Sequence, residues 1–169
     1  SNYIAGVNAG NSITAGGNFN VTVGDEAGTA ITTGDNNTAV GYGAGDAIIT
    51  GSHNTFLGQN AGTATTGSNN TGIGRHALLS NTSGTNTAVG YTALDANTTG
   101  TSNVAVGDAA LGANVAGDQS VAIGTEALLV QNPSGNVDMN NVAVGYRAGY
   151  AVTTGTLNTI IGALAGDAL

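Results

Sequence analysis

NTAVGYGAGDAIITGSH, at residues 37–53, is followed later in the chain by NTAVGYTALDANTTGTS at 86–102 and NVAVGYRAGYAVTTGTL at 141–157. The shared element, Asn-(Thr/Val)-x-(Val/Ile/Leu)-Gly, recurs along the whole chain, and a weaker copy, NYIAG, ends at Gly6. Consecutive copies lie 16–18 residues apart, except for one spacing of 21 residues between Gly124 and Gly145. The sequence is therefore an array of ten repeats of about 17 residues, and we treat residues 1–169 as one domain.

Each complete repeat holds two glycine positions that predict corners of the chain, because glycine adopts positive φ at sharp turns without steric cost. The first, called here the corner glycine, ends the motif at Gly24, Gly41, Gly58, Gly74, Gly90, Gly107, Gly124, Gly145 and Gly162. The second usually follows Thr or Ser, as at Gly51 and Gly100. A unit this short does not fit a helix-turn-helix repeat. It predicts an all-β parallel β-solenoid (a β-roll) of about ten coils, each with two short strands and two bends.

Alternation within the motif separates two columns of side chains, because successive strand residues point to opposite faces. The residues on either side of the motif centre pair as Thr38 with Val40 and as Thr87 with Val89. We expect this β-branched column to point inward. The central residue, usually alanine, is then expected to point outward.

Two further positions, three residues apart in each repeat, vary together in size. Where the first is leucine, the second is polar, and where the first is glycine, the second is usually a large aliphatic residue. Leucine stands at Leu78, Leu94, Leu111 and Leu128, and glycine stands at this position in the other repeats. Three residues on, the leucine repeats carry Asn or Gln, whereas most glycine repeats carry Ile or Val. Positions that exchange volume are expected to share one packed space. The four leucines are therefore predicted to stack in the core.

After the weaker first copy, the first residue of the motif is asparagine in eight repeats, at Asn20, Asn37, Asn54, Asn70, Asn86, Asn103, Asn141 and Asn158. Stacked coils would place these amides about 4.8 Å apart, within reach of a hydrogen-bonded ladder. The alternative is a row of solvent-exposed asparagine turns.

Charge and composition exclude several classes of protein. The formal net charge is −8, and Arg75 and Arg147 are the only basic Lys or Arg side chains, so the clustered cations that bind nucleic acid are missing. No apolar run approaches the ~18 residues of a transmembrane helix, so membrane insertion is not expected. Cysteine is absent, and glycine makes up 29 of 169 residues.

Groups that converge for catalysis are not apparent, so we expect no enzyme activity, cofactor or metal site. His53 and His76 occupy different phases of the repeat and are interpreted as surface residues. Tyr42, Tyr91 and Tyr146 all follow a corner glycine, where they either form contact points or shield a corner. The irregular insertion at about 130–140 is either a binding loop or a bulge that a solenoid tolerates.

The repeats NTAVGYGAG, NVAVGDAAL and SVAIGTEAL resemble those in the head domains of YadA-like trimeric autotransporter adhesins. Similar arrays occur in phage tail fibres and other long surface fibres. The resemblance implies a left-handed roll, an extracellular or cell-surface location, association into homotrimers and adhesion to a host or surface ligand. The repeat of this chain is longer than that of the adhesin heads.

The chain begins inside a motif and stops half a coil after Gly162. We expect either a head-to-tail filament, in which the chain pairs with itself, or a piece of a longer trimeric fibre. The expected function is therefore that of a structural fibre protein, adhesive or scaffolding, with a phage tail-fibre segment as the alternative. Ice binding ranks lower, because the threonine column is expected to point inward.

Overall fold

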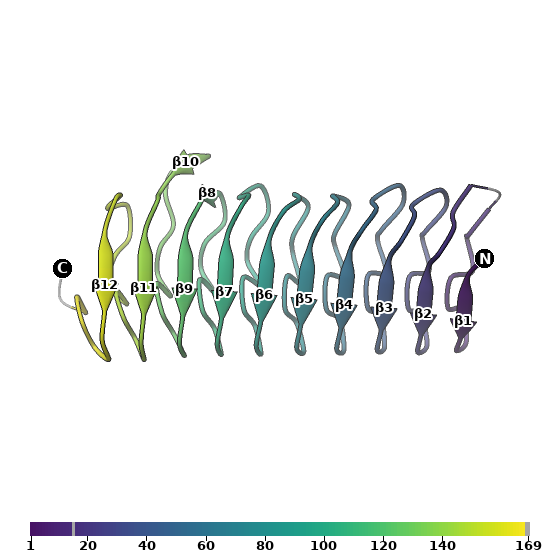
Figure 1. Ribbon diagram of the computed structural model, residues 1–169, viewed down its shortest axis with the longest axis horizontal. Helices are drawn as coiled ribbons and strands as arrows, with labels where there is room; N and C mark the ends of the chain where they lie inside the picture. The colour runs from purple at the N-terminus through teal and green to yellow at the C-terminus, as the bar shows by residue number, and fades with distance from the viewer. Residues whose placement is uncertain (15, 168–169) are drawn as a thin grey trace.

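The computed structural model describes residues 1–14 and 16–167, which form a rod of stacked coils (Figure 1). The rod is a parallel β-solenoid with a repeat of about 17 residues, as predicted, and the described residues contain no helix. One parallel sheet holds ten strands in the order of the coils. They are β1 (Tyr3–Ala5), β2 (Val21–Val23), β3 (Thr38–Val40), β4 (Thr55–Leu57), β5 (Thr71–Ile73), β6 (Thr87–Val89), β7 (Val104–Val106), β9 (Val121–Ile123), β11 (Val142–Val144) and β12 (Thr159–Ile161).

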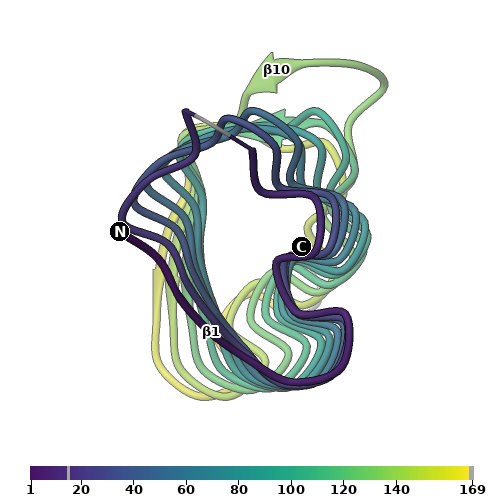
Figure 2. The ribbon, with the colours of Figure 1, turned by 90° about the vertical axis from the view of Figure 1, so that its right-hand side faces the viewer.

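The strands pair in the register that the repeats define. Thr38 lies beside Thr55, and Val40 lies beside Leu57, so equivalent motif positions stack along the rod. Figure 2 shows the coils from the N-terminal end, where the chain passes down β1 and around the lower edge counter-clockwise as it recedes. The solenoid is therefore left-handed.

Each coil contains one three-residue strand of this sheet, and among the described residues only the coils with β8 (Gly117–Asp118) and β10 (Val137–Asp138) add a second strand, so the expectation of two strands per coil is wrong for most coils. The cause is the left-handed backbone in the turn, for example at Glu26 (φ 61°) and Gly28 (φ 58°). Backbone hydrogen bonds still join neighbouring coils across this turn, because the Gly28 N–H donates to the Ala44 carbonyl at 2.8 Å. The ladder therefore continues around the coil without regular strand geometry.

The central strand residues point into the coil, and the flanking residues point out, which is the reverse of the prediction. Ala39, Ala88 and Phe56 are fully buried, whereas Thr38 and Val40 are only partly buried. The interior is thin, because the turn that follows the corner glycine folds back against the strand. A small central side chain leaves room for that turn.

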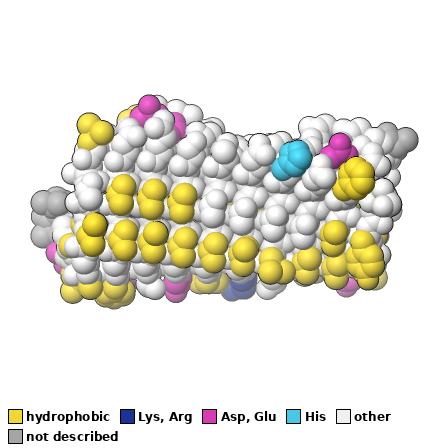
Figure 3. All heavy atoms as spheres, viewed as in Figure 1, with side chains coloured by type: hydrophobic (Ala, Val, Ile, Leu, Met, Phe, Trp, Pro, Cys, Tyr) yellow, Lys and Arg dark blue, Asp and Glu magenta, His cyan; other side chains and the backbone are white. Residues whose placement is uncertain are grey.

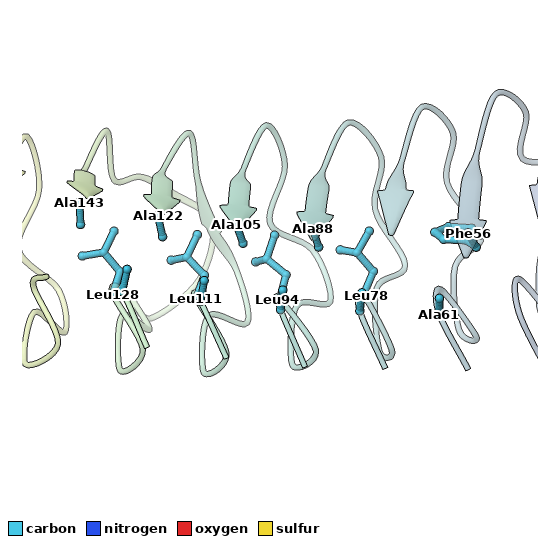
Figure 4. Packing of buried hydrophobic residues seen from close by; sticks show 14 of the residues in the cluster. Phe56, Ala61, Leu78, Ala88, Leu94, Ala105, Leu111, Ala122, Leu128 and Ala143 are labelled. Atoms are coloured by element: carbon cyan, nitrogen blue, oxygen red, sulfur yellow. The ribbon is translucent and has the colours of Figure 1, made fainter. Parts of the chain in front are cut away.

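The interior is filled in two ways, and Figure 4 shows one of them, a row of four leucines that face strand alanines. We call the coils with Leu78, Leu94, Leu111 or Leu128 leucine coils, and the others glycine coils. All four leucines are fully buried in one hydrophobic cluster, as predicted. In the glycine coils, the space is taken by a side chain three residues on, as at Ile31 and Ile48, both fully buried.

Phe56 is the largest buried side chain, and glycines make room for it. A Cβ atom added to Gly72 would lie 2.9 Å from Phe56 Cδ1, and one added to Gly45 would lie 3.1 Å from Cδ2. Gly62 touches the same ring. The large side chain of one coil is therefore compensated by glycines in its own coil and in both neighbouring coils.

The insertion forms a loop that projects from the rod (Figure 2). It carries β10 (Val137–Asp138), which pairs in parallel with β8 (Gly117–Asp118) to form a separate two-stranded sheet. Met139 anchors the loop, because its side chain is fully buried. The loop leaves the stacking of β9 on β11 intact.

Candidate functional site

The motif asparagines form a buried hydrogen-bonded column along the rod. The Asn37 backbone N–H donates to Asn20 Oδ1 at 2.9 Å, and Asn37 Nδ2 donates to the same oxygen at 3.1 Å. Asn37 Nδ2 also donates to the Gly51 carbonyl at 2.9 Å. The structure brings all eight predicted asparagines into this column, which is fully buried except at Asn158. Its amides bond within and between coils and are not exposed turns.

The column is interrupted once, at Ser120, and a neighbouring amide replaces the missing asparagine. Gln131 Nε2 donates to Ser120 Oγ at 3.1 Å, and Asn141 Nδ2 donates to Gln131 Oε1 at 2.8 Å. The glutamine therefore bridges the coil that lacks the asparagine. Buried polar groups are costly when unpaired, which accounts for this replacement.

The leucine coils hold a second buried amide column, formed by Asn81, Asn97, Asn114 and Gln131. Asn97 Nδ2 donates to Asn81 Oδ1 at 2.7 Å and to the Gly100 carbonyl at 2.9 Å. Its own Oδ1 has no hydrogen-bond partner among the described atoms. These amides bond to the backbone bend and to one another.

The corner glycines form a single file, and all of them except Gly162 are required for two reasons. Their φ values lie between 123° and 141°, a region that side chains with a Cβ rarely adopt. A Cβ atom at Gly107 would also lie 2.5 Å from the Gly124 carbonyl carbon in the next coil. The predicted corner role therefore agrees with the backbone at these nine positions.

The second glycines are required for space rather than for positive φ, so that part of the prediction is wrong at most of them. Gly34, Gly51 and Gly67 do not adopt left-handed φ. A Cβ atom at each would collide with a carbonyl group of the next coil.

The outer face of the sheet is the surface that sequence reasoning missed (Figure 3). It consists of the first and third residues of the ten strands. The first positions are Tyr3, Val21, Thr38, Thr55, Thr71, Thr87, Val104, Val121, Val142 and Thr159, and the third are Ala5, Val23, Val40, Leu57, Ile73, Val89, Val106, Ile123, Val144 and Ile161. The outward threonines remove the reason for ranking ice binding low. The sequence did contain one indication that the central strand residues point inward. Phe56, the largest central residue, is accompanied by glycine at the positions that its ring contacts, as at Gly62 and Gly72.

A second exposed row lies just after the corner glycines. Arg75 lies over the ring of Tyr91 at 5.6 Å, and Arg147 lies over Tyr146 at 5.4 Å and Tyr150 at 5.0 Å. A hydrogen bond to Glu126 raises the pKa of Arg147. Tyr42, Tyr91 and Tyr146 are about half exposed, so they do not seal a corner. The two arginines bind tyrosines of this row.

No group of three or more His, Cys, Asp or Glu side chains in the described part of the chain could hold a metal ion. His53 is exposed and His76 is partly buried, stacked against Tyr91. A pocket of about 250 Å³ lies at Ala151–Thr153, Gly155 and Asn158. The equivalent residues of the following coil begin at 168, outside the described residues, so we assign no ligand to it.

Comparison with protein-family models, curated proteins and solved structures found no match. Among the residues described, no helix has the length and apolarity needed to cross a membrane.

Proposed function

We propose that this chain is a non-enzymatic structural protein that forms the shaft of an extracellular fibre. The observation that carries the proposal is the uniform bonding between coils. The strand ladder and the corner-glycine file repeat from coil to coil along the rod, and so does the asparagine column except at Ser120, where Gln131 bridges the gap. Such a module gains length and stiffness by adding coils, because each coil contacts only its neighbours.

The ends of the sheet support elongation. β1 and β12 are its edge strands, so each has one side without a partner among the described residues. Unpaired strand edges are templates for pairing with another chain. In the proposed fibre, further coils of the same kind continue the ladder at these edges. Adhesion, in a surface adhesin or a phage tail fibre, would then use exposed side chains such as the half-exposed Tyr42, Tyr91 and Tyr146.

A proline variant at the β12 edge tests elongation. The Val142 N–H donates to the next coil at the Asn158 carbonyl, so the equivalent N–H of Thr159 faces the open edge. Thr159→Pro removes this donor, and Thr159→Val retains it as the matched control. Electron microscopy over a concentration series should show wild-type and Thr159→Val rods that lengthen at constant width, and Thr159→Pro rods that stay short. Wild-type rods of one fixed length at every concentration would contradict the proposal.

A further inference from the structure

The outer face is an uncharged surface, mainly of aliphatic side chains and threonines, on an acidic protein. None of the ten strands that form it contains a charged residue, although the net charge of the chain is −8. Figure 3 shows one long row and one shorter row of hydrophobic side chains along the rod, with charged side chains towards the margins of the view. Contiguous apolar surfaces mark interaction sites on soluble proteins.

We infer that two copies of this chain pack against each other through their outer faces. The absence of charged residues from the face permits a second copy as the occupant. Two molecules of charge −8 repel each other, and this neutral strip lets them approach while their carboxylates stay outside the contact. The pairing is lateral, so it does not rest on the proposed elongation of the rod.

The size of the face is the first argument for a second copy. Ten strands about 4.8 Å apart give a length of about 48 Å, and two outward side chains roughly 7 Å apart and about 4 Å wide give a width of about 11 Å, so the strip covers about 500 Å² per copy. Two such strips bury about 1,000 Å² in total, which reaches the lower limit for a specific protein–protein interface. Only a partner that is itself straight and equally long covers the strip completely, and a second copy meets this condition.

The placement of the insertion is the second argument. The loop that carries β10 projects from the upper side of the coil, away from the side on which β1 and the rest of the sheet lie (Figure 2). The longest irregularity of the chain therefore leaves the outer face unobstructed. The face also keeps its strand register across the insertion, because Val121 pairs with Val142.

The composition of the face favours a protein partner over ice. The first-position column changes from threonine in β3–β6 to valine in β7, β9 and β11. In the third-position column, Leu57 is 47% exposed and lies between Val40 and Ile73, which differ from it in shape. A rigid crystal plane needs an even array, whereas side chains of a second copy can repack around Leu57.

A charge placed at the middle of the face tests the pairing. Val89→Glu in β6 would oppose carboxylates across the contact, and Thr154→Glu adds the same charge at an exposed position outside the face. At concentrations below those at which rods lengthen, sedimentation velocity should show dimers for wild type and Thr154→Glu, and at least about tenfold weaker association for Val89→Glu. Val89→Thr keeps the side-chain shape and replaces Val89→Glu as the test variant if Val89→Glu does not fold. It should weaken association by a smaller factor than Val89→Glu.

Small-angle scattering then separates lateral pairing from elongation, because a lateral dimer is wider and an end-to-end dimer is longer. Wild type that stays monomeric, that only lengthens, or that pairs as well after Val89→Glu and Val89→Thr overturns the inference. A monomeric wild type that inhibits ice recrystallisation, with the inhibition lost in Val89→Glu, overturns it and assigns the face to ice.

Discussion

Leucine coils and glycine coils use the same backbone to enclose different interiors. Leu94 has a φ of 51° at the position where Gly45 has a φ of 58°, so the turn is left-handed in both. In the leucine coil, the side chain of Leu94 fills the core, and the residue three positions later is Asn97. In the glycine coil, the residue three positions after Gly45 is Ile48, and its side chain fills the core instead. The backbone path is therefore set by contacts that both classes share.

The leucine coils show that packing overrides local preference. A left-handed backbone costs a residue with a Cβ about 1–2 kcal/mol. Complete burial of a leucine side chain stabilises by about 1.5–3 kcal/mol. Burial therefore offsets the conformational cost at Leu78, Leu94, Leu111 and Leu128, all of which are fully buried.

Among the substitutions considered, those at the corner glycines are expected to reduce stability most. Leucine coils and glycine coils share these glycines. Gly41→Ala and Gly107→Ala should each lower the free energy of unfolding by at least about 3 kcal/mol, because both strain φ and collide with the next coil. Urea unfolding followed by circular dichroism measures this. Gly135→Ala is the control, since its φ is 86° but its Cβ would meet nothing within 4 Å. Equal losses in Gly107→Ala and Gly135→Ala would show that coil contact is unimportant.

Conversion of the Gly45 coil into a leucine coil should cost less when both columns change, although the contact with Phe56 remains. Gly45→Leu alone should cost about 1–3 kcal/mol by overpacking, because its Cβ would lie 2.7 Å from Ile48 Cδ1. Gly45→Leu with Ile48→Asn should cost at least about 1 kcal/mol less than the sum of the single changes. The new asparagine can bond to the Gly51 carbonyl, as Asn97 does to Gly100. Additive losses in this double-mutant cycle would refute the exchange of volume.

Phe56 and Gly72 test the same exchange between neighbouring coils at the class boundary. Gly72→Ala should cost about 1–2 kcal/mol, because the added methyl group meets the Phe56 ring. In a Phe56→Leu background, the same substitution should be neutral or stabilising, since it fills the space left by the ring. Thermal unfolding of the four variants measures the coupling, and a loss that is unchanged in that background would show that the ring is not the obstacle.

The smallest effect is expected from two aspartates at equivalent turn positions of the two classes. Burial raises the pKa of Asp95 above 3.8, and burial together with the charge of Glu26 raises that of Asp46. The folded state then favours the protonated form, so stability is gained as pH falls through the raised pKa and lost as pH rises. Asp95→Asn should slightly raise the unfolding midpoint at pH 7, and this gain should vanish below about pH 4.

The effect of salt on stability should distinguish Asp46 from Asp95. Added salt should reduce the gain from Asp46→Asn more than the gain from Asp95→Asn, because only Asp46 has the Glu26 contribution. A lowered midpoint at pH 7 in either variant would show that its carboxylate stabilises the fold.

The repeat itself predicted the strand register, because equivalent residues in every copy can only align if the coils stack. It did not predict which side of a three-residue strand faces the core, since alternation allows both choices. The bulk of Phe56 beside three glycines resolves that choice, but only when neighbouring coils are considered together. The left-handed turn at Leu94 was beyond prediction, because leucine does not favour it and tertiary packing imposes it.

The file of corner glycines has a consequence for the evolution of length. Each glycine rests against the carbonyl of the next, so a duplicated segment of about 17 residues would enter the file and advance the rod by roughly 4.8 Å. The chain is in this sense a molecular ruler, on which gene duplication or deletion changes reach in equal increments.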